Sequence, residues 1–105
     1  MTIAEEKYHQ IADSIPETKK GSMFGALCLK ADNNGKAGVM FRKDCMVFKL
    51  DGEHLKNALE LDGASMFQPA EGRTMNGWVS LPYNHSGKWL DFAILSIEFV
   101  KKLKK

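Results

Sequence analysis

The residues that could carry chemistry are few, and they lie far apart in the sequence. The three histidines, His9, His54 and His85, have no cysteine, histidine or carboxylate at the spacing of metal ligands. His54 follows Asp51 and Glu53, and this group fits the solvated first turn of a helix better than a metal site. We therefore expect no metal site and no bound cofactor.

The two cysteines, Cys28 and Cys45, are both flanked by apolar residues. Cysteine is among the most buried residue types, so we expect two buried free thiols, with a disulfide or a reactive thiol as the alternative. A cysteine nucleophile would also need a histidine beside it in space. The other candidates lie outside any nucleophile-elbow pattern or on predicted helix surfaces: Ser80, Ser86, Ser96, Glu5, Glu6, Glu60 and Asp62. These patterns predict a protein that is not an enzyme.

The stretch KKGSMFGALCLK, residues 19–30, has the residue types of a phosphate-binding loop. A P-loop needs G-x-x-x-x-G-K-[ST] between a strand and a helix. Here Gly21 and Gly25 are four residues apart, and Gly25 precedes an apolar run that fits a strand. No helix N-terminus is expected there to bind an anion. The pattern favours a strand, with Gly21 at its entry and Gly25 inside it.

Composition and charge indicate one globular domain over residues 1–105. Hydrophobic residues make up 44% of the chain and charged residues 27%, values that exclude a disordered chain. The net charge of +2 is weaker than the basic footprint of dedicated nucleic-acid binders. The N-terminal residues show no signal-peptide core, and charge interrupts the apolar stretches before a membrane-spanning length of about 20 residues. We expect a cytoplasmic protein without a membrane partner.

Hydrophobic spacing predicts that the N-terminal half contains a helix and then three strands. The helix is expected at residues 3–15, capped by Thr2 and ended by Pro16. Tight turns at Asp32-Asn33-Asn34-Gly35 and Lys43-Asp44 should join the strands into an antiparallel meander. The expected strand ranges are 22–30, 36–42 and 45–50.

The C-terminal half should add two helices and one further strand. The first helix is expected over residues 51–63, capped by Asp51 and stopped by Gly63. The elements that follow are a loop at 64–72 with a short partner strand at 66–68, a strand at 73–81, a turn at 82–87 and a helix from Ser86 to the end.

Several motifs follow one another in the order found in a known family. Met23-Phe24-Gly25 opens a strand, Gly35-Lys36 ends a hairpin turn, and VMF at residues 39–41 and Lys49-Leu50 come next. The pattern is completed by a helix, Met66-Phe67-Gln68-Pro69, Met75-Asn76-Gly77-Trp78, Leu81-Pro82 and a long C-terminal helix. Over about residues 18–103 the chain resembles the N-terminal domain of TfoX, the bacterial competence regulator.

The resemblance implies a two-layer α+β fold. An antiparallel sheet would be packed by an N-terminal, a middle and a long C-terminal helix, similar to the secretion-chaperone-like class that often forms homodimers. It also implies a non-catalytic regulatory or protein-interaction module, linked to transcription or competence regulation. Full-length TfoX-like regulators carry a second, C-terminal domain that has no counterpart in these residues. The resemblance brings no catalytic, cofactor or metal residues with it.

The final helix has more apolar residues than one contact with a sheet needs, because nine of the twelve residues in 89–100 are apolar. One stripe contains Trp89, Ala93, Ile97 and Val100, and a second contains Phe92, Leu95 and Phe99. Soluble monomers rarely leave large apolar patches bare. We therefore expect a homodimer or an unknown protein partner, with Trp89, Phe92, Leu95 and Phe99 as the candidate interface. The alternative is a helix that is wholly buried within one chain.

Lysine clusters keep open a second function, a weak nucleic-acid-binding regulator. The cations that could combine into a patch are Lys19, Lys20, Arg42, Lys43, Lys101, Lys102, Lys104 and Lys105. Trp78, Tyr83 and Trp89 could stack on bases, although they stand at apolar positions where core packing is the more common role. Phosphate contacts make binding fall steeply with salt, whereas an apolar interface responds little.

Overall fold

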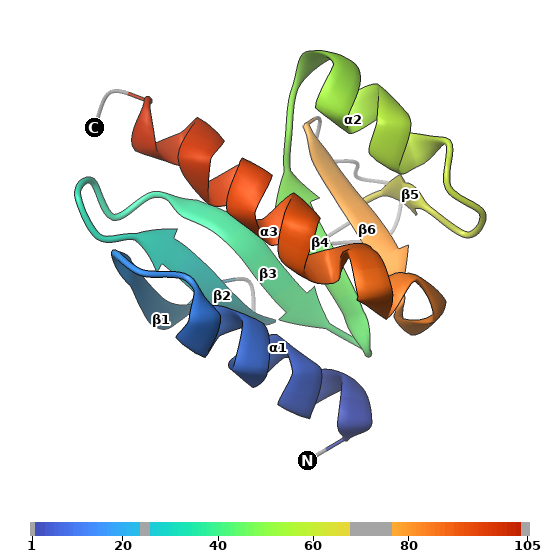
Figure 1. The fold of residues 1–105 in the computed structure, drawn as a ribbon, viewed down its shortest axis with the longest axis horizontal. Helices are drawn as coiled ribbons and strands as arrows, with labels where there is room; N and C mark the ends of the chain where they lie inside the picture. Colours follow the sequence, from blue (N-terminus) through green and yellow to red (C-terminus); the bar gives the residue numbers. More distant parts are fainter. Residues whose placement is uncertain (1, 24–25, 68–76, 104–105) are drawn as a thin grey trace.

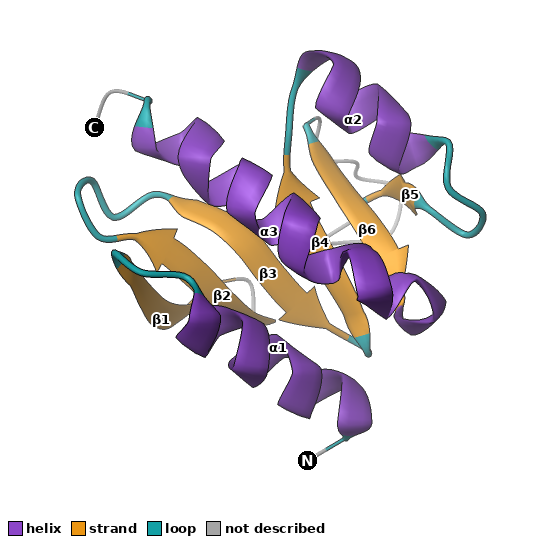
Figure 2. Cartoon of the chain, viewed as in Figure 1, coloured by secondary structure: helices purple, strands orange, loops and turns teal. Residues whose placement is uncertain are grey.

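The computed structural model describes residues 2–23, 26–67 and 77–103. It has the predicted α+β class (Figure 1, Figure 2). Within the described residues, three α-helices, six strands and one short 3-10 helix follow in chain order: α1 (Ile3–Ser14), β1 (Thr18–Met23), β2 (Ala26–Ala31), β3 (Ala37–Arg42), β4 (Cys45–Lys49), α2 (Gly52–Leu59), β5 (Ser65–Met66), β6 (Trp78–Pro82), η1 (Tyr83–His85) and α3 (Ser86–Lys101).

The six strands form one antiparallel sheet in the order β1-β2-β3-β4-β6-β5. The predicted meander corresponds to β2, β3 and β4, and both of its turns are confirmed. Gly35 has a φ of 72°, and Lys43 and Asp44 have φ values of 52° and 62°. Two consecutive residues with positive φ form the tight turn whose twist matches that of a hairpin. This turn sets the register between β3 and β4, with Val39 opposite Phe48.

The prediction of a single strand over residues 22–30 is wrong. The chain forms β1 and β2 instead, which pair antiparallel with Gly21 opposite Cys28. Gly21 lies inside β1 rather than at a strand entry, and Phe24 and Gly25 lie outside the described residues. The sequence TKKGSM of β1 has no apolar alternation, so pairing with β2 at the sheet edge determines this strand. β2 is an inner strand, as its two-sided apolar sequence predicts.

The main hydrophobic core lies between the helices and one face of the sheet. Figure 1 shows α1 and α3 side by side across this face, with α2 beside β6. The strands contribute Leu29, Ala31, Val39, Phe41, Met46, Phe48, Val79 and Leu81 to this core. The opposite face, which we call the second face, carries a smaller cluster of Cys28, Met40, Val47, Phe67 and Trp78. Successive side chains along a strand point to opposite faces, and this alternation separates the two clusters.

α1 is fixed at its start by a cap and in its middle by a tyrosine. The Glu5 backbone N–H donates to Thr2 Oγ1 at 3.1 Å, which confirms the predicted cap. The Tyr8 hydroxyl donates to the backbone carbonyl of Cys28 at 2.8 Å, and its ring stacks on Phe41. Burial raises the pKa of Tyr8 to about 12, because the phenolate would lose its hydration; the neighbouring Cys28 adds to the shift.

α3 packs closely on the sheet because β3 contains a glycine beneath it. A Cβ atom at Gly38 would lie 3.1 Å from the backbone oxygen of Ser96. The end of α3 is bound by the turn between β2 and β3. Asn34 Nδ2 donates at 2.8 Å to the carbonyl of Val100, in the last turn of α3, and at 3.1 Å to that of Leu103, just beyond the helix.

The remaining predicted elements occur with shifted bounds. Asp51 precedes α2 as expected, but its side chain makes no capping hydrogen bond, and the helix ends at Leu59, before Gly63. The short partner strand is β5, which pairs with β6.

The turn expected over residues 82–87 contains η1, and α3 begins at Ser86 as predicted. Residues 68–76 of the expected loop and strand lie outside the described residues. Within the described ranges, no helix combines the length and the apolar character needed to cross a membrane.

Candidate functional site

A pocket of about 360 Å³ opens on the second face of the sheet, beside the turn between β3 and β4. This volume lies in the range of small-ligand pockets, about 300–1,000 Å³. The polar lining consists of Arg42 and Lys43, the thiol of Cys45, and the hydroxyls of Ser65 and Ser80. Val47, Met66 and Phe67 supply the apolar lining.

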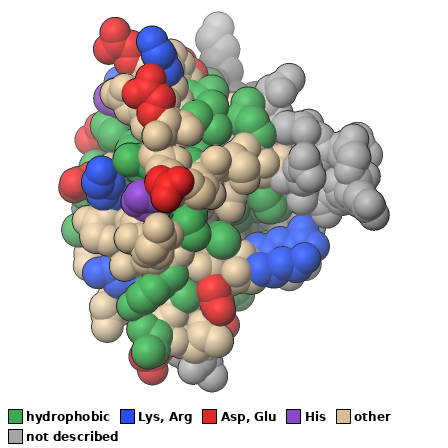
Figure 3. Space-filling model, turned by 90° about the vertical axis from the view of Figure 1, so that its right-hand side faces the viewer, with side chains coloured by type: hydrophobic (Ala, Val, Ile, Leu, Met, Phe, Trp, Pro, Cys, Tyr) green, Lys and Arg blue, Asp and Glu red, His purple; other side chains and the backbone are tan. Residues whose placement is uncertain are grey.

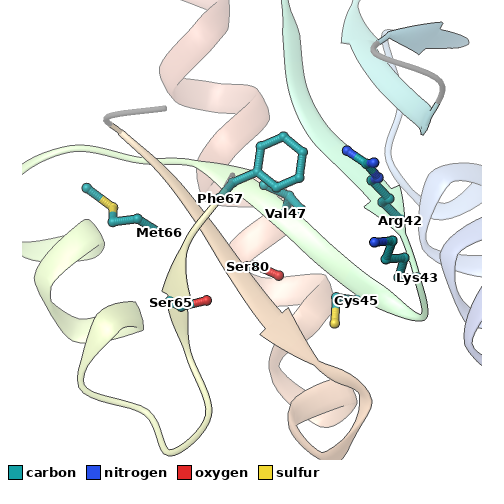
Figure 4. Close-up of a pocket in the computed structure, with 8 residues that line it drawn as sticks. All are labelled: Arg42, Lys43, Cys45, Val47, Ser65, Met66, Phe67 and Ser80. Atoms are coloured by element: carbon teal, nitrogen blue, oxygen red, sulfur yellow. The ribbon is translucent and has the colours of Figure 1, made fainter. Parts of the chain in front are cut away.

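The side chains of the pocket are arranged by type (Figure 4). The nitrogen atoms of Arg42 and Lys43 lie on one side, and the hydroxyls of Ser65 and Ser80 point toward them from the other. Val47 and Phe67 close one end of the space between them, and the apolar surface of Phe67 belongs to the buried second-face cluster. The arrangement places two cations opposite two hydroxyl groups, next to apolar side chains that are themselves buried.

The pairing of β4, β6 and β5 brings the neutral part of the lining together. Val47 lies opposite Ser80 on β6, and Ser80 lies opposite Ser65 on β5, so the three residues form one row across three strands. Arg42 and Cys45 are paired in the adjacent row. All five side chains therefore point to the second face, because residues opposite each other in a ladder share a face.

The tight turn between β3 and β4 holds the cations at the edge of this row. Because the turn consists of only Lys43 and Asp44, Arg42 and Lys43 cannot move far from Cys45. Thr2 Oγ1 donates to Asp44 Oδ1 at 2.8 Å, which connects the turn to the start of α1. Arg42 has a further interaction within the chain. The contact between Thr2 and Asp44 therefore helps to hold Lys43 in the turn, next to Arg42 at the end of β3.

The charged residues of the described strands are all basic, and most of them lie on the second face. None of the six described strands contains Asp or Glu. Strand alternation places four cations on the second face: Lys19, Lys30, Arg42 and Lys49. Lys19 pairs with Asp32 at 3.2 Å, and Lys49 lies 5.4 Å from the ring centre of Trp78. Figure 3 shows, on the side of the molecule toward β5, Lys or Arg side chains next to hydrophobic ones.

The two cysteines have different environments. Cys28 is a buried free thiol, as predicted, and burial raises its pKa while the nearby Lys30 offsets part of the shift. Cys45 is also free, but it is only half-buried and lines the pocket, so the prediction of two buried thiols is wrong for this residue. The cause is its place at the start of β4, next to the turn, where the second-face cluster does not cover it.

The histidines lie apart from the pocket lining. His9 is 3.7 Å from Glu5 on α1, and His85 Nε2 contacts the backbone oxygen of Asp62. No histidine and no carboxylate is among the lining residues that the structure describes. Within the same residues, no group of three or more potential metal ligands comes together.

The candidate interface on α3 is placed mostly against the core. Trp89 is 0% exposed and belongs to the main core, while Phe92, Leu95 and Phe99 are partly buried against it. The Phe92 ring lies 5.8 Å from that of Phe48. Contact of these residues with a second chain stays a prediction. The apolar side chains of α3 that remain exposed are Leu90, at 37%, and Ile94, at 39%.

The sequence did not predict that the residues of this pocket lie together. It considered Arg42, Lys43, Cys45 and Ser80 under separate hypotheses and did not include Ser65. The alternation WVSLP of β6 could have placed Ser80 on the face opposite Val79 and Leu81. Ser65 depends on the pairing of a two-residue strand, for which the sequence has no periodic signal.

Comparisons with protein-family models and with curated proteins find no match for this sequence. The resemblance to the TfoX N-terminal domain therefore stays a prediction.

Proposed function

We propose that this chain is a non-catalytic regulatory module of the kind found at the N-terminus of TfoX-like proteins, which acts by binding a protein partner. The pocket beside the β3–β4 turn is the observation that carries this proposal. It offers the cations Arg42 and Lys43 and the hydroxyls Ser65 and Ser80 for binding an anionic group. General acid–base catalysis mostly uses His, Asp or Glu, and the described lining has none of these. This composition supports recognition over catalysis.

Supporting features of the proposal come from the fold and the motif order. The two-layer arrangement and the helix order are those that the resemblance implies. A role in transcription or competence regulation, a cytoplasmic location and a homodimeric state follow from the same resemblance and belong to the proposal. In this view the pocket binds an acidic or modified group of the partner.

The experiment is affinity capture from lysate of the cells that make the protein, with and without nuclease, using the tagged chain and two variants. Lys43→Glu reverses a charge in the pocket. Lys36→Glu makes the same change at the opposite end of β3, outside the lining, and serves as the matched control. We expect a nuclease-resistant protein that is retained by the wild-type chain and by Lys36→Glu and is lost with Lys43→Glu. Equal retention by all three chains would contradict the proposal.

A nucleic-acid-binding regulator is a second candidate, and the basic residues of the second face favour it. These are Lys19, Lys30, Arg42 and Lys49, of which Lys19 pairs with Asp32 and Arg42 has a further interaction within the chain. Nucleic acid recovered by the same capture, and lost after nuclease or at high salt, would support this candidate in place of the first, because phosphate contacts are strongly salt-dependent.

A further inference from the structure

We propose that the pocket beside the β3–β4 turn binds a carboxylate. This inference rests on the proposed function, because it names the group of the partner that the pocket recognises. The carboxylate belongs either to an acidic side chain of a partner protein or to a free small acid, and both sources present the same two oxygens.

Three hydrogen-bond donors of the lining have no acceptor within the described part of the chain. Among these residues the structure gives no hydrogen bond and no ion pair to Lys43 Nζ, Ser65 Oγ or Ser80 Oγ. The described lining also contains no Asp or Glu that could accept from them. A ligand therefore has to bring the acceptors, and an ionised carboxylate consists of acceptors only.

The donors lie on two sides of the pocket (Figure 4). Lys43 extends from the β3–β4 turn, and the hydroxyls of Ser65 on β5 and Ser80 on β6 point toward it. A carboxylate has two oxygens with several lone-pair positions, so one group can accept from both sides. The hydrogen bond from Lys43 is charge-assisted, and such bonds are about twice as strong as those between neutral groups.

Lys43 is the cation that selects an anionic ligand. The selection does not depend on Arg42, which also lines the pocket but has an interaction within the chain. Asp44, the other residue of the turn, accepts a hydrogen bond from Thr2 at the start of α1. The positive charge of Lys43 matches the single negative charge of a carboxylate.

The apolar residues of the described lining leave little surface for a ligand. Val47 is 0% and Phe67 is 5% exposed, while Met66 is partly exposed. The ligand therefore needs no apolar part, and its polar group makes most of the contacts. A pocket of about 360 Å³ is near the lower limit for small-ligand sites, so the part of the ligand that it holds is small.

The test is a titration of the purified, isotope-labelled chain followed by amide chemical shifts. The probe is glutamate blocked by acetyl and amide groups, so that its side chain carries the only charge, and blocked glutamine is the uncharged control of nearly the same shape. We expect a dissociation constant on the order of 10 mM for blocked glutamate, shifts confined to the pocket strands, and weaker binding of blocked glutamine. Equal binding of the two probes, or tighter binding of inorganic phosphate, would overturn the inference.

The thiol of Cys45 gives a second measurement of occupancy in the same pocket. Cys45 is half-buried and lines the pocket, whereas Cys28 is 0% exposed, so N-ethylmaleimide should modify Cys45 first. At about three times its dissociation constant, blocked glutamate should slow this modification about fourfold, because most pockets are then occupied. The same concentration of blocked glutamine should have a smaller effect. A rate that blocked glutamate leaves unchanged would contradict binding in this pocket.

Two variants with matched controls test the donors. Lys43→Gln should weaken the binding of blocked glutamate by about threefold to tenfold, because it removes the charge, while Lys36→Gln outside the lining should leave it unchanged. Ser80→Ala should weaken it by about twofold to fivefold, with Ser22→Ala on β1 as the control. Unchanged affinity in either pocket variant would contradict the inference.

A short blocked peptide with one central Glu among Ala residues distinguishes the two sources. Tighter binding of the peptide than of blocked glutamate assigns the carboxylate to a protein, and equal or weaker binding assigns it to a free small acid.

The titration needs no partner protein, so it separates this inference from the proposed function. Carboxylate binding without any pocket-dependent partner in the capture experiment would leave the ligand chemistry standing and remove the regulatory role. A pocket-dependent partner without carboxylate binding would remove the ligand chemistry alone.

Discussion

A single residue affects the stability of this chain most where its polar atom is buried and has one hydrogen-bond partner. Tyr8 is the clearest case, because its hydroxyl is buried between α1 and β2 and donates to the Cys28 carbonyl. A buried donor satisfied in this way contributes about 1 kcal/mol, and an unsatisfied partner costs more. The same burial that favours this hydrogen bond disfavours the phenolate, so the hydroxyl connects stability to pH.

The stability of the folded chain should fall as pH rises from 10 to 12. Unfolded Tyr8 ionises near its ordinary pKa of 10.0, whereas folded Tyr8 ionises at about 12, so the unfolded state loses its proton first and gains stability over this window. The slope from one such group is at most about 1.4 kcal/mol per pH unit. We expect Tyr8→Phe to be less stable at neutral pH by about 1–2 kcal/mol and to lose this part of the slope.

Urea unfolding at pH 8, 10 and 11 measures the effect, with Tyr83→Phe as the control because Tyr83 is 42% exposed. The raised pKa of Cys28 adds a slope of the same sign, which both variants retain. Parallel pH profiles for Tyr8→Phe and Tyr83→Phe would show that Tyr8 does not couple folding to pH.

At the scale of elements, glycine decides how closely α3 approaches the sheet. Gly38→Ala should lower the free energy of unfolding by about 1–3 kcal/mol, because the new Cβ would lie 3.1 Å from the Ser96 oxygen and 3.2 Å from Ile97 Cδ1. Gly87→Ala is the matched control, since a Cβ there meets no atom within 4 Å and alanine favours the helix. Denaturant midpoints for the two variants test this, and equal midpoints would mean that α3 adjusts without cost.

The elements that follow from local rules were predictable, and those that follow from pairing were not. The Asn34-Gly35 and Lys43-Asp44 turns and the buried stripe of α3 have sequence signals of their own. β1 and β5 do not, because the first is polar and the second has only two residues. The pocket depends on the register of β4, β6 and β5, which cannot be deduced from any one segment of the sequence. Most of its residues could therefore be named from the sequence, but not the fact that they lie close together.

At the scale of the whole molecule, the acidic residues are unevenly distributed between helices and strands, although the net charge is small. The net charge is +2, yet every described strand lacks acidic residues, while the helices contain Glu5, Glu6, Asp13, Glu53, Asp91 and Glu98. The net charge taken alone predicts against a nucleic-acid partner. Recognition depends on the local field at a face, so the separated cations make an anionic ligand more plausible than the sum indicates.

The helical side of the molecule should support self-association through α3. Trp89 is buried within the chain, so we expect a contact between two chains to centre on the exposed apolar side chains of α3, Leu90 and Ile94. Ile94 borders a groove of about 180 Å³ whose apolar lining also includes Ile15, Pro16 and Ile97. An exposed apolar side chain and an apolar groove on the same surface allow a twofold contact in which each chain fills the groove of the other.

Light scattering at micromolar concentrations should therefore give twice the chain mass of 11.8 kDa. Ile94→Lys should return the mass to that of one chain, because it places a charge in the apolar contact. Ile3→Lys is the control, since Ile3 is the most exposed large apolar residue described, at 69%, and does not line the groove. A single-chain mass for the wild-type protein would contradict the dimer.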